Sequence, residues 1–486
     1  LGNPQQAAIQ YGPYTYDFAA IGYDLFVMDS WRLRSNLSLE LGLRYEYVSP
    51  YSEEDNRLVN LDAAPGFTAV APVQPGQVGP YTGLLYPSAL VKPDRDNFAP
   101  RVGFAWRAMS KMVVRGGYGI NYNVGQYQSI VQQLAYQPPF SFTQTIVPST
   151  PTQFTLQNAL AQPSTGQVTN NYGVDPNYRL GYVQLWNLNV QYEIRPTLVL
   201  NVGYTGTKGT DLDVIEAPNR GPAGLVIPNV QAFLWETSQG FSTYNGGSAR
   251  LRKRMTRGFS VGGTYTYSKS IDDASSIGGS AVVVAQNPQD LDAQRGLSSF
   301  DMRHNFTADY LYELPFGTGK RWLDSGGTVA HSLVSHILGD WNYSGTAAIQ
   351  SGTPWTARVL GSFSDVAGGA NGSLWANYNG QPIQVSNPST QQWFNTAAFS
   401  VPPSGQFGNA GRNTIIGPGQ INFNMSLNKN IPMKDMMSME LRITATNVFN
   451  TPHFTTIDTV VNSPTFGQVT AVGTMRQLQV LARFRF

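Results

Sequence analysis

Few residues of this sequence combine the types and spacing that catalytic sites use. The segment Gly258-Phe-Ser-Val-Gly262 matches the G-x-S-x-G elbow that presents the nucleophilic serine of many hydrolases. Such an elbow places the serine between a strand and a helix, whereas Ser260 opens a segment whose apolar residues recur at every second position. We therefore interpret the match as a coincidence in a glycine-rich strand, and we do not expect the chain to be an enzyme.

The histidines give little support for a metal centre. His331 and His336 lie five residues apart, whereas a spacing of four places two ligands on one face of a helix. We interpret both as part of a polar connector, with a short helix predicted over residues 329–338. His304 and His453 are isolated, and we expect structural roles for them. No cofactor is expected.

Two acidic pairs carry the type of ligand that Ca²⁺ prefers. Asp94 and Asp96 belong to one predicted loop, and Asp272 and Asp273 belong to another. Carboxylates in surface loops can bind Ca²⁺. Solvated loop charge and salt bridges at the ends of hairpins explain the same residues, and we favour this second interpretation.

The composition limits the class of protein. Charged residues make up 13% of the 486 residues and aromatic residues 12%, whereas charged residues reach roughly 25% in average soluble proteins. A surface so poor in charge suits a protein whose outside faces lipid. The longest apolar run, residues 281–285, is far shorter than the roughly 18 residues of a spanning helix. Any membrane span must therefore consist of strands.

Net charge and cysteine content exclude further classes. A net charge of +2 lacks the basic excess of a nucleic-acid-binding protein, so no nucleic-acid partner is expected. The sequence contains no cysteine, which excludes disulfides and thiolate metal sites.

Apolar and polar residues alternate along about 13 segments, and this period of two predicts β-strands. In the clearest segment, residues 37–47, leucines and tyrosines alternate with polar residues and glycine. About ten such residues span a bilayer core when tilted by about 45°. The predicted strands cover residues 20–32, 37–47, 101–107, 114–122, 186–194, 198–204, 244–255, 259–269, 306–314, 341–349, 421–428, 441–449 and 478–486.

The connections between these strands alternate between short and long. Short turns centre on Ser35, Ser110, Pro196, Arg257 and Met433. The long connections cover residues 49–96, 124–180, 206–242, 270–300 and 353–418. Short periplasmic turns and long external loops are typical of barrels in the outer membrane of Gram-negative bacteria. The sequence therefore predicts an all-β, antiparallel transmembrane barrel. A soluble propeller or sandwich would need partly polar residues at the outward positions.

The last strand shows both faces of such a barrel. Its apolar face carries Leu478, Val480, Ala482, Phe484 and Phe486. A terminal aromatic residue of this kind is similar to the last strand of outer-membrane barrels, which closes the barrel and is recognised by the barrel assembly machinery. That resemblance implies outer-membrane lipid and the assembly machinery as partners.

Several arginines alternate with the apolar residues, and we expect them to face the lumen. A cation at mid-membrane on the lipid face costs about 2–4 kcal/mol, which favours the inward position. The predicted lumen residues are Arg44, Arg101, Arg107, Arg115, Arg483 and Arg485, with Arg250 and Arg252 in the same pattern. Pairing with neighbouring acids or with a plug domain is the favoured role, and an electropositive lumen that steers anionic solutes is the alternative.

Several motifs recur in one family in this order. They are residues 26–31 (FVMDSW), 39–46 (LELGLRYE), 97–104 (NFAPRVGF), 203–209 (GYTGTKG), 265–269 (YTYSK), 300–306 (FDMRHNF), 312–317 (YELPFG) and 447–452 (NVFNTP). With them the chain resembles the Oar-like branch of TonB-dependent receptors over nearly its whole length. That resemblance implies a 22-stranded barrel with an N-terminal plug, of which this sequence supplies 13 to 14 strands.

The resemblance also implies a division of the chain and a function. Residues 1–19 are expected to be part of an external loop, and residues 20–486 the C-terminal part of the barrel, with the plug and upstream strands missing. The implied function is uptake of an unidentified solute, with TonB acting through the missing N-terminal part. The alternative is an adhesion or signalling protein that presents the long loops at 124–180 and 353–400 to a surface ligand.

Overall fold

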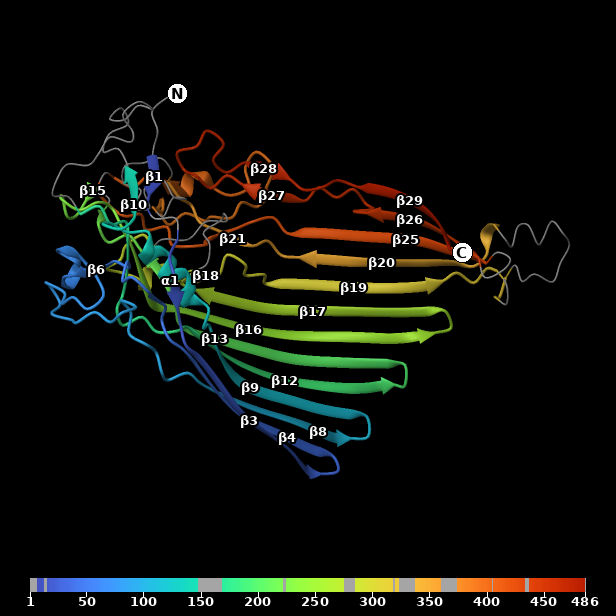
Figure 1. Cartoon of the computed structure of the whole chain (residues 1–486). Coiled ribbons are helices and arrows are strands. Elements are labelled where there is room, and N and C mark those ends of the chain that lie inside the picture. The colour runs from blue at the N-terminus through green and yellow to red at the C-terminus, as the bar shows by residue number, and fades with distance from the viewer. Residues whose placement is uncertain are drawn as a thin grey trace.

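Thirteen long strands of the computed structural model run side by side in chain order, each antiparallel to its neighbours, through one 15-stranded sheet (Figure 1). The structure describes residues 7–12, 15–146, 168–221, 224–274, 285–317, 320–322, 337–359, 374–403, 405–432 and 437–485. The strands are β3 (Gly22–Arg34), β4 (Leu37–Val48), β8 (Phe98–Met109), β9 (Met112–Tyr122), β12 (Tyr182–Arg195), β13 (Leu198–Glu216), β16 (Leu234–Thr256), β17 (Phe259–Asp272), β19 (His304–Glu313), β20 (Trp341–Gln350), β25 (Gln420–Pro432), β26 (Ser438–Thr446) and β29 (Gln477–Arg485). The predicted all-β antiparallel architecture is confirmed.

The two ends of the sheet differ. Tight turns at Ser35, Ser110, Pro196 and Arg257 join successive strands at one end, which we call the turn side. The long connections gather at the other end, which we call the loop side (Figure 1). The chain ends on the turn side. The predicted separation of short turns and long loops is therefore confirmed, with one exception: β19 ends at Glu313 on the turn side, and the connection from there to Trp341 is longer than the other turns. The turn predicted at Met433 lies outside the described residues.

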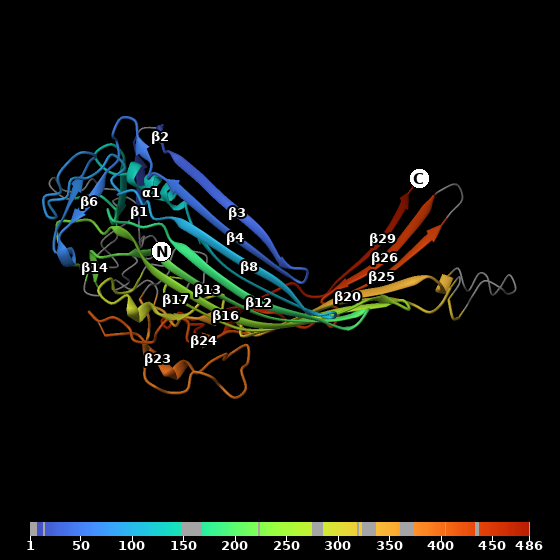
Figure 2. The same cartoon turned by 90° about the horizontal axis from the view of Figure 1, so that it is seen from below.

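The sheet is strongly curved, and β3 and β29 lie at its two ends (Figure 2). Within the described chain, β3 pairs only with β4, and β29 pairs only with β26. The side chains on these two strands are accordingly open, with Phe26 79% and Val480 77% exposed.

The turn between β16 and β17 depends on backbone conformations that favour glycine. Arg257 has a φ of 52° and Gly258 a φ of 74°, and positive φ at both central residues matches the twist of a two-residue hairpin. A Cβ atom on Gly258 would lie 3.3 Å from the Cβ of Glu313. The turn therefore has little room for a side chain at this position.

Replacing Gly258 with alanine should lower the free energy of unfolding by about 1–2 kcal/mol, because a left-handed conformation is costly with a Cβ. Urea unfolding of the protein in lipid vesicles measures the change. Gly247→Ala on β16 is the control, since nothing lies within 4 Å of the Cβ it would add. An equal loss in both variants would contradict the turn argument.

The register keeps most of the apolar residues of these strands on one face. Val190 on β12 lies opposite Val114 on β9 and Val202 on β13. Val202 in turn lies opposite Ala249 on β16. Directly opposed residues share a face of the sheet, so this pattern builds a continuous apolar face. Many of its large side chains are exposed, including Leu188, which is 47% exposed.

Aromatic residues border the apolar face at its loop side and at its turn side. On β3, Tyr23 lies toward the loop side and Trp31 toward the turn side, and β8 repeats this spacing with Phe98 and Trp106. Eight residues of strand cover about 26 Å, close to the apolar band of about 25 Å between the aromatic girdles of membrane barrels. The apolar face therefore has the height of a bilayer core.

Some boundaries differ from the prediction. The loop predicted at 206–242 is shorter, because β13 continues to Glu216 and β16 begins at Leu234. The strand predicted to reach Phe449 ends at Thr446. Most of the helix predicted at 329–338 lies outside the described residues.

The long connections contain elements of their own, and we call them together the loop layer. In the described parts of these connections, the loop layer contains the helix α1 (Gln126–Ala135) and the 3₁₀ turns η1 (Pro65–Phe67), η2 (Asp292–Gln294) and η3 (Thr396–Ala398). Its short strands are β1 (Ala7–Tyr11), β2 (Phe18–Ala19), β5 (Ser52–Glu53), β6 (Asn60–Ala63), β7 (Val70–Val73), β10 (Phe142–Ile146), β11 (Tyr172–Val174), β14 (Arg220–Gly221), β15 (Gly224–Leu225), β18 (Gly296–Leu297), β21 (Pro354–Trp355), β22 (Asn377–Tyr378), β23 (Phe399–Ser400), β24 (Ile415–Ile416), β27 (Phe454–Ile457) and β28 (Val469–Val472). None of the helices among the described residues is long and apolar enough to cross a membrane.

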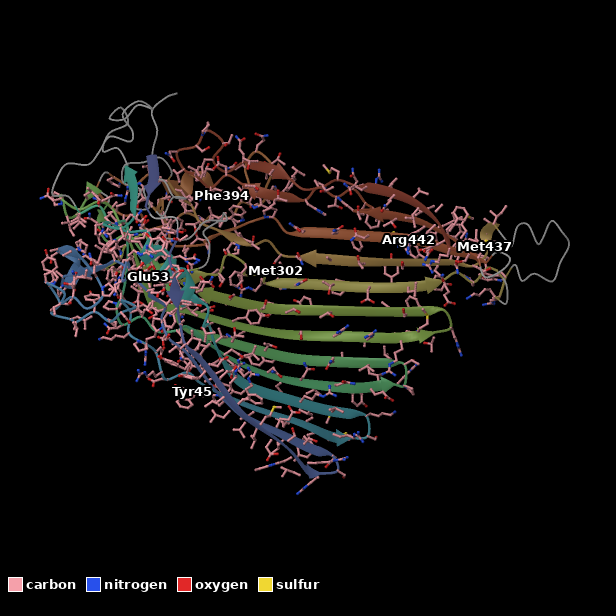
Figure 3. The ribbon with its side chains drawn as sticks, viewed as in Figure 1. Tyr45, Glu53, Met302, Phe394, Met437 and Arg442 are labelled. Carbon is pink, nitrogen blue, oxygen red and sulfur yellow. The ribbon has the colours of Figure 1, made fainter. Side chains whose placement is uncertain are left out.

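The loop layer has hydrophobic cores. The largest joins the connections that follow β4 and β9, and α1 buries Ile130 and Leu134 in it. A second core surrounds Phe394 and joins the connections that follow β20 and β26. Glu53 and Phe394 lie in the loop layer, whereas Arg442 lies on the sheet toward the turn side (Figure 3). The long connections are thus packed structures.

Candidate functional site

The face of the sheet opposite the apolar rows is polar, and the arginines singled out in the sequence lie on it. Arg101 on β8 lies opposite Gly42 and Gly119, and Arg250 on β16 lies opposite Asn201 and Thr264. By the same register, the polar face carries Arg44, Arg101, Arg107, Arg115, Arg250, Arg252, Arg483 and Arg485.

These arginines differ in their partners. Arg44 makes ion pairs with Asp24 and Glu46, the second at 2.6 Å. Arg101 donates to the Asn121 amide oxygen at 3.0 Å, and Arg115 donates to that of Gln191 at 3.3 Å.

Another group of arginines leaves its positive charge without a partner. Within the described chain, no ion pair or side-chain hydrogen bond is found for Arg107, Arg250, Arg252 or Arg483. The positive charges of these four arginines are therefore not neutralised by other side chains of the described chain.

The last strand contributes to both faces. Leu478, Val480, Ala482 and Phe484 lie opposite apolar residues of β26, whereas Phe486 lies outside the described residues. On the polar face, Arg485 donates to Glu440 at 3.3 Å. Glu440 also pairs with Arg442, so one carboxylate joins β26 to β29.

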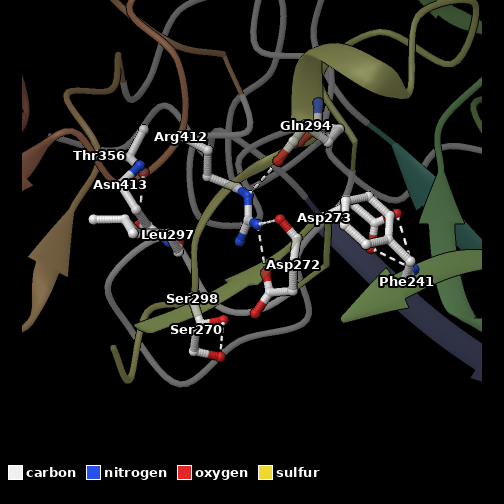
Figure 4. Close-up of polar contacts among 10 residues, drawn as sticks. All are labelled: Phe241, Ser270, Asp272, Asp273, Gln294, Leu297, Ser298, Thr356, Arg412 and Asn413. Atoms are coloured by element: carbon white, nitrogen blue, oxygen red, sulfur yellow. Dashed lines mark hydrogen bonds and ion pairs between the residues drawn. The ribbon is translucent and has the colours of Figure 1, made fainter. Parts of the chain in front are cut away.

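A buried ion pair connects two parts of the loop layer (Figure 4). The side chain of Arg412, in the connection after β20, is 0% exposed and pairs with Asp272 at the end of β17. Its guanidinium also donates to the backbone oxygens of Asp272 and Gln294, the second at 2.7 Å. Arg412 thus holds three acceptors that the sequence places more than 100 residues away.

The neighbours of Arg412 extend this connection. Asn413 donates through its side-chain amide to the Leu297 carbonyl at 2.6 Å and through its backbone N–H to the Thr356 hydroxyl at 2.8 Å. A Cβ on Gly296 would lie 2.5 Å from the Arg412 carbonyl oxygen, so only glycine allows this approach. The contacts fix the connection after β17 against the one after β20.

The sequence matches over residues 1–479 a family described as an outer membrane beta barrel domain. The chain belongs to this family of outer-membrane β-barrel domains. The barrel domain is therefore located in the outer membrane, and its apolar face contacts lipid. No curated protein matches the sequence.

The barrel domain is similar to solved outer-membrane proteins. The transporter YddB from Escherichia coli is 9% identical, with 96% of this chain and 55% of that chain covered at a TM-score of 0.47. The ferripyoverdine receptor of Pseudomonas aeruginosa, bound to ferripyoverdine, is 10% identical, with 96% and 39% covered at a TM-score of 0.44. The ferric-catecholate import receptor Fiu from E. coli K12 is 12% identical, with 96% of this chain and 45% of that chain covered at a TM-score of 0.42. The chain spans between 39% and 55% of the length of these proteins.

A carboxyl pair, buried Glu236 and half-buried Asp213, lies where the barrel domain meets the loop layer. Asp213 is 15 residues beyond Leu198 on β13, about 50 Å along the strand and hence outside the membrane. Burial, the nearby Glu236 charge and a hydrogen bond with Glu236 raise the pKa of Asp213 to about 8. The pair therefore holds a proton at neutral pH.

Residues of the loop layer donate hydrogen bonds to Asp213 and Glu236. Tyr172 donates to Glu236, and Tyr178 donates to Asp213 at 3.3 Å. Gln126, the first residue of α1, donates to Glu236 at 2.9 Å. Because β11 also pairs with β16 in this region, the protonated pair connects α1 and β11 to the sheet.

The remaining catalytic and metal candidates have structural surroundings. Ser260 lies within β17, opposite Leu311 of the next strand. A ring nitrogen of His304 lies 2.7 Å from the Tyr265 hydroxyl, and one of His453 lies 2.9 Å from the Ile421 carbonyl oxygen. His331 and His336 fall outside the described residues.

The acidic pairs are occupied by protein groups. The Asp94 carboxylate accepts the backbone N–H of Leu180 at 3.0 Å, and Asp96 pairs with Arg179 at 3.2 Å. Asp273 accepts the backbone N–H of Phe241 at 3.0 Å. Among the described residues, no group of three or more His, Cys, Asp or Glu side chains is placed to hold a metal ion.

A cation on the apolar face should be costly for the barrel domain. Leu188→Arg, in the middle of β12, should lower the free energy of unfolding from vesicles by about 2–4 kcal/mol. Asn187→Arg is the matched control, because Asn187 lies on the polar face opposite Gly117 and Thr205. Urea titration in vesicles measures both, and equal losses would contradict the assignment of the two faces.

Proposed function

We propose that this chain is the C-terminal barrel part of a TonB-dependent receptor that takes up a solute across the outer membrane. Residues 20–486 would supply barrel strands, and residues 1–19 would belong to an external loop. TonB would act through a plug in the upstream part of the protein. The main support is a polar, arginine-bearing face that ends beneath a packed loop layer, since such a face suits the wall of a solute passage.

Each part of the structure has a role in this proposal. The loop layer would capture the solute on the outside. Arg107, Arg250, Arg252 and Arg483 would line the lumen and attract anionic groups, because charged walls raise the local concentration of oppositely charged solutes. The apolar row of β29, from Leu478 to Phe484, and Phe486 of the sequence after it would close the barrel and be recognised by the assembly machinery.

The proposal can be tested with cells that carry the full-length protein. They are grown with a mixture of siderophores, oligosaccharides and peptides, and the medium is analysed for solutes that disappear. We expect at least one class to be depleted only by cells that carry the protein and retain a proton gradient. No energy-dependent depletion, together with protein-dependent attachment of the cells to surfaces, would support adhesion and overturn the uptake proposal.

A further inference from the structure

A concave site lies on the apolar face where β3 and β4 reach the loop layer. Its cavity volume is about 370 Å³. The lining residues are Ile21, Tyr23, Tyr45, Tyr47, Ser49 and Arg95. The site is therefore mainly aromatic and carries one charged side chain.

The aromatic wall belongs to the lipid-facing side of the sheet. Tyr23 lies opposite Tyr47, and their rings stack with centroids 6.0 Å apart. Leu25, on the same face, lies opposite Tyr45, whose ring is 4.9 Å from that of Phe98. Tyrosines at this height meet the boundary between acyl chains and headgroups. An occupant of the site would thus have one apolar and one polar end.

Arg95 supplies the polar end with an unneutralised charge. Its flanking carboxylates are engaged elsewhere, Asp94 by the Leu180 N–H and Asp96 by Arg179. No hydrogen bond or ion pair of the Arg95 side chain is found in the part of the chain that the structure describes. A guanidinium presents a fork of N–H donors that matches phosphate oxygens.

We propose that this site binds an anionic phospholipid-like molecule of the loop-side leaflet, with its phosphate on Arg95 and its acyl chains along Leu25 and Val27. The cavity lies at the membrane boundary, the wall is aromatic, and the single charge is positive. These three observations together favour a phosphate-bearing lipid. The proposal concerns the outer surface of the barrel and does not depend on uptake through the lumen.

Native mass spectrometry of the full-length protein tests this proposal. Wild type is released from nanodiscs that contain phosphatidylglycerol and phosphatidylcholine with the same acyl chains, and the retained lipids are counted. Arg95→Gln should reduce phosphatidylglycerol retention about fivefold, the factor one basic residue contributes at a membrane surface, without changing phosphatidylcholine retention. Arg95→Lys should keep most of the retention.

Two controls make the outcome decisive. Lys111→Gln removes an exposed cation at the β8–β9 turn, on the opposite edge of the barrel, and should leave retention unchanged. Tyr47→Ala should reduce retention of both lipids, because it removes part of the aromatic wall. Unchanged phosphatidylglycerol retention in Arg95→Gln, an equal loss in Lys111→Gln, or full displacement of the lipid by millimolar inorganic phosphate would overturn the proposal.

Discussion

Replacing Arg412 with methionine is expected to destabilise the loop layer by about 3–5 kcal/mol, because removing one partner of a buried ion pair leaves the other charge in the interior. Asp272 is 4% exposed and would keep its carboxylate there. The backbone oxygens of Asp272 and Gln294 would also lose a donor. Hydrogen exchange of the amides in β18 and at the end of β17 measures the local opening energy.

Two further variants show whether the loss in Arg412→Met comes from the unpaired buried charge of Asp272. Arg179→Gln breaks an exposed pair whose side chains are 57% and 80% exposed, and exposed pairs contribute less than about 1 kcal/mol. Adding Asp272→Asn to Arg412→Met should restore part of the loss, because the buried charge disappears. If Arg412→Met and Arg179→Gln have the same small effect, the buried pair does not hold the two connections together.

Raising the external pH from about 4 to 8 should loosen the attachment of α1 and β11 to the sheet. An unfolded aspartate loses its proton near pH 3.8, whereas folded Asp213 keeps it until about pH 8. Between these values the unfolded state binds fewer protons, so stability falls as pH rises, by at most about 1.4 kcal/mol per pH unit for one group. Glu216, whose pKa burial raises to about 7, contributes in the same direction.

Hydrogen exchange of the β11 amides across this pH range, corrected for intrinsic rates, measures the effect. Asp213→Asn should stabilise this region at pH 7 and flatten its pH dependence, because the amide keeps the shape of the carboxyl group without its charge. Asp17→Asn, at an exposed loop position, should leave the slope unchanged. Glu216 should leave a smaller slope in Asp213→Asn. A slope in Asp213→Asn as large as that of wild type would contradict the role of this pair.

The strands were predictable because the alternation of apolar and polar residues that defines a strand lies within one short segment of the sequence. A strand such as β4 repeats every second residue, and the turn at Ser35 interrupts the repeat where the chain reverses. The faces of Arg44 and Arg101 follow from the same parity, since register keeps alternate residues on one side. The sequence also contains the extension of β13, because Leu212 and Val214 continue its alternation. Glycine and charge between residues 206 and 211 concealed it.

The loop layer was not predictable in the same way. Its core residues, such as Leu58 and Tyr172, come from different connections and show no common period. Arg412 and Asp272 are separated by 140 residues, and nothing near either residue identifies its partner. The helix α1 is short, and its apolar residues Ile130 and Leu134 lie in a segment rich in glutamine. Long-range packing decides these features.

Among the thirteen long strands of the described chain, each pairs only with those next to it in the sequence. A barrel built in this way can change its circumference by one hairpin at a time. If β12 and β13 were deleted together with one long connection, β9 and β16 would still run in opposite directions and would be joined on the loop side. Their apolar rows could meet on the same face after a shift of an even number of residues. Duplication or loss of hairpins could thus widen or narrow related barrels two strands at a time without reversing any remaining strand.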